Sequence, residues 1–422
     1  MLIGIDASRA NRKFKSGTEW YSYHLIRELA KIDSKNQYIL YSDKPLKRGL
    51  IDLTDENDSD NPIKINSCGW QEIKSQHGNF RAKILKWPFQ FLWTQARLSY
   101  EILAHPVDIL FIPAHALPII HPKKSIVTIH DIGFERYCNL YNADKIGPEN
   151  GLISKIFDFL AQMFTFGKFR SNILDYHSWS AKFSLSRAAA IIAVSEFTKK
   201  EIMELYKTDE KKIKVVRHGL DGKLYRRISD NEKIEQVLNK YDIKKPYIFY
   251  VGRLEKKKNT AKLVEAYAVM RKKFKHIKHK MVLVGSAGFG FDEVKYVINE
   301  FDIEEDVIIT GWIPESDMPY IYNGADMFVF PSIYEGFGIP LLEAMSCGTP
   351  IAASNTASIP EVAQDAALLF NPENKDDMAE KMAKILSDKQ FAEKLAEKGF
   401  ARIKDFSLEK CAKQTLELIE NI

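Results

Sequence analysis

Short apolar runs alternate with amphipathic helical segments along most of the chain. This alternation is typical of β-α-β units, in which parallel strands are buried beneath helices on both faces of a sheet. The strands expected in the first half are Leu2–Asp6, Tyr38–Tyr41, Ile109–Ile112, Ile126–His130, Ala190–Val194 and Ile213–Val216. Those expected in the second half are Tyr247–Val251, Met281–Val284, Val307–Thr310, Met327–Phe330, Pro350–Ala353 and Ala367–Phe370. We therefore predict an α/β protein with two doubly wound parallel sheets.

Helices are expected between these strands and beyond the last of them. Thr18–Lys31, Thr198–Tyr206, Asn259–Lys273 and Pro340–Ser346 have helical patterns, and so do Asp376–Leu386, Gln390–Ile403 and Leu408–Ile419 after Pro372. Doubly wound sheets bind ligands outside the carboxyl ends of their strands. Two such Rossmann-like domains are expected to face each other across a cleft and share a ligand there.

The chain of 422 residues has room for two domains of ordinary size. We place the first domain at residues 1–222, a charged linker at 223–245 and the second domain at 246–405. A last helix at 406–422 is expected to pack back on the first domain.

Composition indicates a soluble globular protein, with 45% hydrophobic and 28% charged residues. The four cysteines form no C-x-x-C pair, so we expect neither a zinc site nor a disulfide framework, and a reducing cytoplasm fits best. The N-terminus resembles a strand rather than a signal peptide. No apolar stretch is long enough to span a bilayer. We predict a cytoplasmic protein, either free or peripheral at the inner membrane face.

The net charge of +5 is carried by the first half of the chain. A basic half would suit an anionic partner such as lipid phosphate, although an ordinary solvated surface explains a small excess equally well. Nucleic-acid motifs are absent, and we expect no nucleic-acid partner.

Three segments carry other residues of interest. Phe80–Tyr100 and Leu152–Trp179 combine basic and aromatic residues, and either could rest in a membrane interface, line an acceptor groove or pack as helices on the first sheet. Asp58-Ser59-Asp60 resembles a metal-binding D-x-D, but no apolar strand leads into it. We expect a solvated loop there and no metal.

The segment that is richest in candidate chemistry follows the expected strand Met327–Phe330. Gly336 and Gly338 allow close approach of backbone to a ligand, and a helix starting near Pro340 offers N–H donors to a phosphate. Glu335 and Glu343 stand on either side of this seat and can accept hydrogen bonds from hydroxyl groups. A nucleotide-sugar has this order of groups, namely sugar, diphosphate and ribose. The alternative is a buried turn with two surface acids.

Two cations follow the first strand of the second half. Arg253 leaves the strand end with a guanidinium suited to phosphate oxygens, and Lys258 adds a point charge before the next helix. Fixed cations there would stabilise the negative charge that develops on a departing diphosphate. The glycine-rich Gly285–Gly290 lacks the G-x-G-x-x-G spacing of a dinucleotide site but could skirt the nucleotide. Ser195 is expected to cap the helix from Thr198.

These motifs together resemble the retaining GT-B glycosyltransferases of family 4. The resemblance rests on Arg253-x4-Lys258, the E-x7-E of Glu335 and Glu343, Pro350–Asn355 with Pro360-Glu361-Val362, Ile129-His130-Asp131 and Ala193–Thr198. It covers nearly the whole chain, and it implies a transferase that needs no metal or other cofactor.

The resemblance also implies roles for single residues. Arg253 and Lys258 would hold the diphosphate, and Gly17 would approach it from the first domain. Glu335 would contact hydroxyls of the donor sugar and Glu343 those of the ribose. His130 would position the reacting sugar. The backbone N–H groups near the donor would be those of Phe337, Gly338 and Ile339.

The expected activity is transfer of a hexose, with retention of configuration, to a saccharide or lipid-linked acceptor in cell-surface polysaccharide synthesis. The mannosyltransferase branch is the most similar, so GDP-mannose is the expected donor and a UDP-hexose is the alternative. A nucleotide-sugar epimerase or hydrolase of the same fold, a non-catalytic scaffold, and a basic adaptor for membranes or nucleic acid are the other hypotheses.

Overall fold

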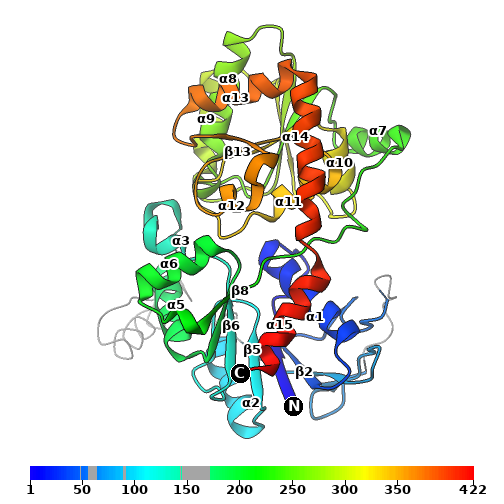
Figure 1. The fold of residues 1–422 in the computed structure, drawn as a ribbon, viewed down its shortest axis with the longest axis vertical. Helices are drawn as coiled ribbons and strands as arrows, with labels where there is room; N and C mark the ends of the chain where they lie inside the picture. Colours follow the sequence, from blue (N-terminus) through cyan, green and yellow to red (C-terminus); the bar gives the residue numbers. More distant parts are fainter. Residues whose placement is uncertain (48, 56–63, 89–91, 143, 145–171) are drawn as a thin grey trace. The chain divides into compact units, whose positions relative to one another are not determined.

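A computed structural model describes residues 1–47, 49–55, 64–88, 92–142, 144 and 172–422 (Figure 1). The chain divides into two compact units. Unit 1 contains Met1–Cys138, Asn142–Gly219 and Leu408–Ile422, and unit 2 contains Asn139–Tyr141 and Leu220–Ser407. The Asp58-Ser59-Asp60 motif, most of Leu152–Trp179 and the residues 89–91 lie outside the described residues.

Unit 1 is built on a sheet whose described strands run in the order β3-β4-β2-β1-β5-β6-β7-β8. Neighbouring strands are parallel except for the antiparallel pair β3 and β4. The strands are β1 (Leu2–Asp6), β2 (Gln37–Ser42), β3 (Trp70–Gln71), β4 (Phe80–Ile84), β5 (Ile109–Ile112), β6 (Ser125–Ile129), β7 (Ala190–Ala193) and β8 (Ile213–Val215). The six strands predicted for this half are confirmed, with bounds that differ by a residue or less at each end.

Strand β4 was not predicted, because Phe80–Tyr100 was expected to form helices or an interface segment. Its apolar residues Phe80, Ala82 and Ile84 are buried at every second position, which is the period of a strand. Lys83 between them is also buried, and its Nζ lies 2.6 Å from Glu101 Oε1. Helical structure in this segment begins only at Trp93.

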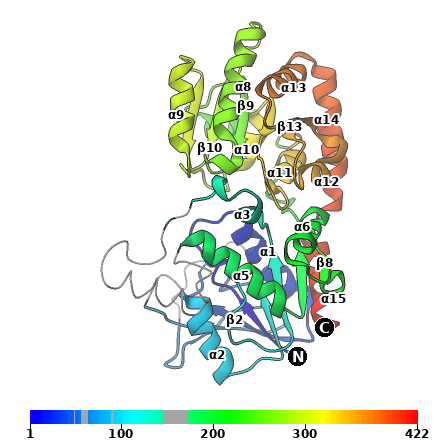
Figure 2. The same ribbon diagram turned by 90° about the vertical axis from the view of Figure 1, so that its left-hand side faces the viewer.

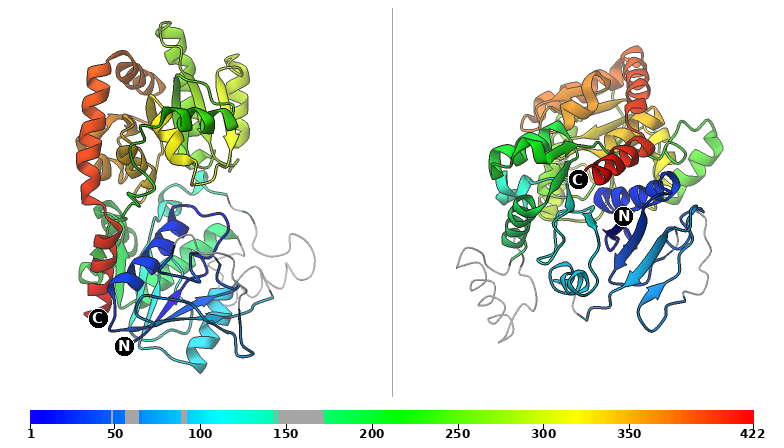
Figure 3. Two further views of the ribbon diagram at one scale, coloured as in Figure 1. Left: turned by 90° about the vertical axis from the view of Figure 1, so that its right-hand side faces the viewer. Right: turned by 60° about the horizontal axis from the view of Figure 1, so that its bottom comes forward.

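The helical segments of unit 1 cover both faces of this sheet. They are α1 (Gly17–Ile32), η1 (Trp93–Leu98), α2 (Ser99–Ala104), α3 (Gly133–Arg136), α5 (Ile173–Arg187), α6 (Glu196–Tyr206), η3 (Glu210–Lys212) and α15 (Leu408–Glu420), while η2 (Cys138–Leu140) falls mostly in unit 2. The C-terminal helix α15 lies along α1 (Figures 1 and 3). Cys411, Ala412 and Ile419 of α15 are buried in the same apolar cluster as Leu25 and Leu29 of α1. The C-terminal helix is therefore part of the core of unit 1.

Unit 2 has a parallel sheet in the order β11-β10-β9-β12-β13-β14. Its strands are β9 (Tyr247–Val251), β10 (Lys280–Val284), β11 (Val307–Gly311), β12 (Met327–Phe330), β13 (Ile351–Ser354) and β14 (Leu368–Phe370). In chain order this is 3-2-1-4-5-6, the order of a dinucleotide-binding doubly wound fold. The direction of winding reverses between β9 and β12, so ligands are expected where these two strands end.

Helices cover both faces of the second sheet as well. They are α7 (Asn231–Lys240), η4 (Lys256–Lys258), α8 (Thr260–Lys273), α9 (Phe291–Glu300), α10 (Met318–Gly324), α11 (Ile339–Cys347), α12 (Ile359–Ala363), η5 (Gln364–Ala366), α13 (Lys375–Ser387), α14 (Lys389–Arg402) and η6 (Ile403–Asp405). Figure 2 shows α8 and α9 side by side, and α13 also packs against α8. Ile248 and Tyr250 of β9 point into the core beneath these helices, while Phe249 between them contacts Tyr322 of α10 on the other face.

The segment 223–245, which we expected to be a linker, belongs to unit 2. It contains α7, whose residues Ile234, Val237 and Leu238 are buried. This helix packs against α10. Part of the charge that suggested a linker, Glu232, Lys233, Glu235 and Lys240, lies on the exposed face of this amphipathic helix.

No helix in the described part of the chain is both long enough and apolar enough to span a bilayer.

Candidate functional site

The loop after β9 and the loop after β10 are joined backbone to backbone. Gly252 N–H donates to Val284 O at 3.0 Å, and Leu254 N–H donates to Ser286 O at 3.0 Å. Gly252 and Gly285 have φ values of +150° and +143°. A Cβ on Gly285 would lie 1.9 Å from Gly252 O, so only glycine allows this approach. The glycine-rich segment after β10 thus holds the backbone on both sides of Arg253 in position.

The side chains of Arg253 and Lys258, which both follow β9, differ in exposure to solvent. The Arg253 side chain is 66% exposed, and its Nε lies 3.6 Å from Glu255 Oε2. Lys258 lies at the end of η4, and its Nζ lies 2.5 Å from Glu335 Oε1. The Lys258 and Glu335 side chains are only 21% and 10% exposed. The ion pair therefore joins the loop after β9 to the loop after β12, at the point where the winding of the sheet reverses.

Hydroxyl groups from the end of β13 and the turn that follows it hold the loop that carries Glu335. Ser354 Oγ donates to Ser332 O at 2.6 Å, and Thr356 Oγ1 donates to Ile333 O at 3.0 Å. Ser358 Oγ donates to the carbonyls of Glu335 and Phe337 at 2.9 and 3.0 Å. Ile333 N–H donates in turn to Lys257 O at 3.0 Å. Because four of its backbone carbonyls accept hydrogen bonds from these hydroxyl groups, the loop is held in one conformation.

Helix α11 begins directly after Gly338, whose φ is +105°. The missing side chain matters here, since a Cβ would lie 3.1 Å from Leu341 and 3.3 Å from Phe330. Pro340 lies in the first helical turn, where it has no intrahelical N–H bond to lose. The predicted donors Phe337, Gly338 and Ile339 therefore lie at a helix N-terminus, which attracts anions.

Glu343 lies in the second turn of α11, is half-buried and contacts tyrosine side chains. Tyr322 Oη donates to Glu343 Oε2 at 2.7 Å, and the Tyr225 hydroxyl is close enough to lower the pKa of the carboxyl group. Burial raises the pKa of Glu343 to about 7, against the lowering effect of these two hydroxyls. Unit 2 thus places Arg253, Lys258, Glu335 and Glu343 on two neighbouring strand ends and the helix that follows.

The remaining predicted site residues, Gly17 and His130, belong to unit 1. Gly17 is the first residue of α1, and Glu19 already occupies this helix N-terminus. The Glu19 carboxylate accepts hydrogen bonds from the backbone N–H and hydroxyl of Ser16, and it lies 3.4 Å from Arg9. An anion approaching Gly17 would therefore meet a carboxylate.

His130 follows β6 and is buried. Its Nε2 lies 2.8 Å from Pro113 O. A carbonyl can only accept, so this contact places the proton on Nε2 and leaves Nδ1 as an acceptor. The His130 ring stacks on His218 at 5.2 Å and meets the edge of Tyr21 at 4.9 Å. Burial lowers the pKa of His130 to about 4, so the ring is neutral near pH 7.

The sequence did not reveal the neighbours of these residues. Burial also lowers the pKa of His115 and His218, whose rings lie 5.4 and 5.2 Å from the ring of His130. His218 follows β8 at a strand end, a position that could have indicated it in the same way as His130. Tyr225 lay in the expected linker, and nothing in the sequence connects it to Glu343.

Acid should destabilise unit 1 through His130. In the unfolded chain its pKa is about 6.5, so below that pH the unfolded state binds a proton that the native state refuses until about pH 4. Stability is therefore lost as pH falls through this window, by about 2 kcal/mol from this residue at pH 5. Urea unfolding at pH 7 and pH 5 measures this loss of unfolding free energy. In the His130→Gln variant the difference between the two pH values should be smaller by about 2 kcal/mol. An unchanged pH dependence in the variant would contradict the assignment.

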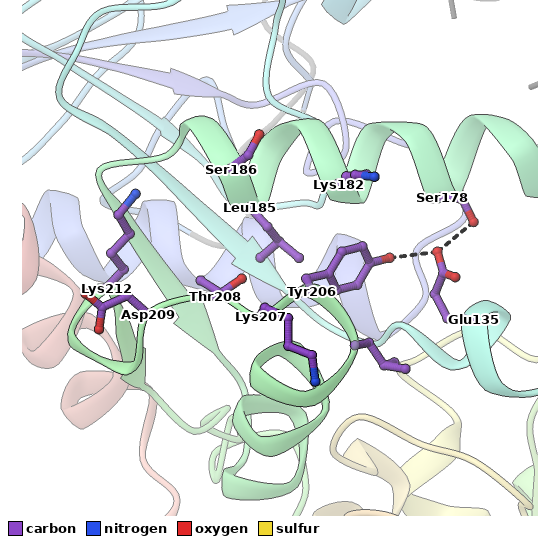
Figure 4. A pocket seen from close by; sticks show the side chains of 11 residues that line it. Glu135, Ser178, Lys182, Leu185, Ser186, Tyr206, Lys207, Thr208, Asp209 and Lys212 are labelled. Carbon is purple, nitrogen blue, oxygen red and sulfur yellow. Dashed lines mark hydrogen bonds between the residues drawn. The ribbon is translucent and has the colours of Figure 1, made fainter. Parts of the chain in front are cut away.

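A separate hollow of about 610 Å³ lies in unit 1 between α5 and α6 (Figure 4). Glu135 Oε1 inside it accepts hydrogen bonds from Ser178 Oγ at 2.6 Å and Tyr206 Oη at 2.8 Å. The lysines at its rim, Lys182, Lys207 and Lys212, are exposed. None of the predicted site residues lines it.

Two family models match complementary parts of this chain. The model described as Glycosyltransferase Family 4 matches residues 15–223, and the model described as Glycosyl transferases group 1 matches residues 230–402. The two-sheet architecture and the residues at the switch point of unit 2 agree with these matches. The chain belongs to family 4 of the GT-B glycosyltransferases.

One relative is the O-antigen chain mannosyltransferase B of Escherichia coli. It is 34% identical over 234 residues, which are 55% of this chain and 61% of that protein. The match thus spans less than two thirds of the relative's length.

Solved structures show the same fold. Sucrose-phosphate synthase from Thermosynechococcus elongatus superposes with a TM-score of 0.69 at 19% identity, covering 100% of this chain and 98% of that one. Anabaena Alr3699/HepE in complex with UDP and glucose superposes with a TM-score of 0.65 at 16% identity, covering 100% and 99%. The predicted GT-B fold is confirmed.

Proposed function

We propose that this protein transfers a hexose from a nucleoside diphosphate sugar to a saccharide or lipid-linked acceptor, with retention of anomeric configuration. The observation that carries the proposal is the Lys258–Glu335 contact beside the N-terminus of α11. It places a cation, a carboxylate and a helix N-terminus at the switch point of a nucleotide-binding sheet. Nucleotide-sugars present a diphosphate next to sugar hydroxyls, which matches this set of groups.

The chemistry of each group follows from its charge and position. Exposed Arg253 and half-buried Lys258 would neutralise the diphosphate and the charge that develops on it as the sugar leaves. The Glu335 carboxylate would exchange part of its contact with Lys258 for sugar hydroxyls when phosphate oxygens arrive. His130, neutral and with Nδ1 as an acceptor, would position the sugar rather than carry a proton. We propose that these cations replace a metal.

GDP-mannose is the donor that we favour, and the matched Escherichia coli mannosyltransferase supports it. A UDP-hexose is the alternative, and the UDP and glucose bound by Anabaena HepE support it. We propose a cell-surface polysaccharide or its lipid-linked precursor as the acceptor, because the matched relative is an O-antigen chain mannosyltransferase.

We further propose that the protein works in the cytoplasm and contacts the inner membrane face. Tyr100 and Leu103 on α2 are 64% and 63% exposed, and Ile119 is 53% exposed. Ile120 N–H donates to Ser99 Oγ, so this loop lies on the start of α2. Exposed apolar residues of this kind suit an interfacial contact, which sedimentation with anionic vesicles would test.

A donor panel tests the proposed activity. GDP-mannose should release GDP in the presence of acceptor oligosaccharide, and proton NMR should show an α-linked product from the α-linked donor. The unfolding free energy should also be measured with GDP and with UDP. A nucleotide that binds only the native state should raise it by about 2.7 kcal/mol at a hundred times its dissociation constant. Release without acceptor would favour a hydrolase or epimerase. Absence of stabilisation by any nucleotide would refute the enzyme and favour a scaffold or adaptor.

A further inference from the structure

We propose that Tyr225 and Tyr322 are positioning residues that hold the Glu343 carboxylate, in place of a cation, as the acceptor for the ribose hydroxyls of the donor. This inference rests on the proposed function, because it assigns the second acid of the site to the nucleoside. The inference gives a role to Tyr225, which lies before α7, and to Tyr322 of α10, neither of which the sequence analysis singled out.

The contacts of Glu343 are unusual for a carboxylate beside a phosphate site. Lys258 is paired with Glu335 instead, whereas the Glu343 carboxyl group accepts a hydrogen bond from Tyr322 Oη and has the Tyr225 hydroxyl close enough to lower its pKa. Tyr322 and Tyr225 are themselves buried, with 0% and 4% of their surfaces exposed. Their rings meet edge to face at 6.1 Å, so each limits the movement of the other.

Both tyrosines are fixed by bonds that do not involve Glu343. Ser346 Oγ of α11 donates to Tyr225 O at 2.5 Å. Asn323, next to Tyr322 on α10, accepts from Ile228 N–H at 2.8 Å and donates to Arg226 O at 2.9 Å. The segment that carries Tyr225 is therefore tied to both α10 and α11. The backbone that carries the two tyrosines is thus held in place within unit 2.

A carboxylate that is held by neutral donors alone remains incompletely compensated. Two ribose hydroxyls would supply further donors and stabilise its charged form. Binding of the nucleoside should then be coupled to loss of a proton from Glu343, whose pKa without ligand is about 7. Affinity should rise as pH increases through 7, and it should fall up to tenfold for each pH unit below this value.

Other titratable groups near Glu343 do not reproduce this dependence. Burial raises the pKa of Cys347, one turn further along α11, well above the range of interest. Glu315 acts on Tyr225 rather than on Glu343. Arg227 lies against Gly348, at the far end of α11, and over the ring of Phe400 at 4.7 Å. Within unit 2, Glu343 is the group that should titrate with the ligand.

The experiment measures the dissociation constants of GDP and UDP by calorimetry from pH 5.5 to 8.5. Tyr322→Phe and Tyr225→Phe each remove one hydroxyl that lowers the pKa of Glu343, so each should move the midpoint of the profile up by about one pH unit and weaken binding about fivefold at pH 7. Glu343→Gln should bind weakly without this pH dependence. The 2′-deoxy analogues of both nucleotides should show a shallower profile with the wild type.

Tyr247→Phe is the matched control. Tyr247 is buried and its hydroxyl donates to Ile321 O at 2.6 Å, beside Tyr322, but it does not contact Glu343. Loss of this hydroxyl should lower stability and leave the pH profile unchanged. The inference is overturned if the wild-type profile is flat, or if both tyrosine variants keep the wild-type midpoint. If neither nucleotide binds the wild type at any pH, the proposed function fails and the ribose assignment fails with it.

Discussion

Replacing Lys258 by methionine is expected to lower release of nucleoside diphosphate from the donor about 10²–10³-fold. Methionine keeps the length and apolar stem of lysine but removes the charge. The ammonium group lies 2.5 Å from Glu335 and next to the N-terminus of α11, so it would meet the diphosphate as negative charge develops there. Steady-state kinetics with the preferred donor should show the loss mainly in kcat.

Stability needs a separate control, because Lys258→Met leaves the Glu335 carboxylate buried without its cation. This should cost about 3 kcal/mol of unfolding free energy. The double variant with Glu335→Gln should recover stability but not turnover, which separates folding from chemistry. Lys275→Met changes an exposed lysine of the same unit and should keep full activity. Equal turnover by Lys258→Met and Lys275→Met would remove Lys258 from the mechanism.

Gly285→Ala is expected to cost about 4 kcal/mol of the unfolding free energy of unit 2. The new Cβ would lie 1.9 Å from Gly252 O, and alanine would also have to adopt a φ of +143°. Relief requires the backbone on either side of Arg253 to move, so donor binding should fall together with stability. Chemical denaturation followed by circular dichroism measures the stability loss.

Two other glycines of unit 2 separate the causes of this loss. Gly311 has a φ of +73°, but a Cβ there would have no atom within 4 Å, so Gly311→Ala should cost only about 1 kcal/mol. Gly222 has neither constraint, and Gly222→Ala should stay within about 0.5 kcal/mol of the wild type. If Gly285→Ala resembled Gly311→Ala, backbone strain alone would account for it and the close approach would be unimportant.

The sequence predicted most of the fold because parallel strands that are buried on both faces are continuous apolar runs. Tyr247–Val251 and Met327–Phe330 have the same bounds in the structure as in the prediction. Strand β4 was missed because its sequence, Phe80–Ile84, carries two basic residues. One of them, Lys83, is buried only because Glu101, eighteen positions further along the chain, pairs with it. A contact of this kind cannot be read from a local pattern.

The site was predictable where its residues follow strands and not where they depend on tertiary contacts. Arg253, Lys258 and Glu335 could be proposed as candidates because they lie in the loops that follow β9 and β12. The pairing of Lys258 with Glu335 was not foreseen, because it depends on the order of strands in the sheet. The tyrosines beside Glu343 were not foreseen either, because Tyr322 and Tyr225 reach it from other parts of the chain.

The position of α15 has a consequence for synthesis of the protein. Residues 408–422 complete unit 1, yet the whole of residues 220–407 precedes them in the chain. On the ribosome, unit 2 is therefore finished while the face of α1 that carries Leu25 and Leu29 still lacks its cover of Cys411, Ala412 and Ile419. Unit 1 can therefore complete its apolar core only after residues 408–422 have been synthesised.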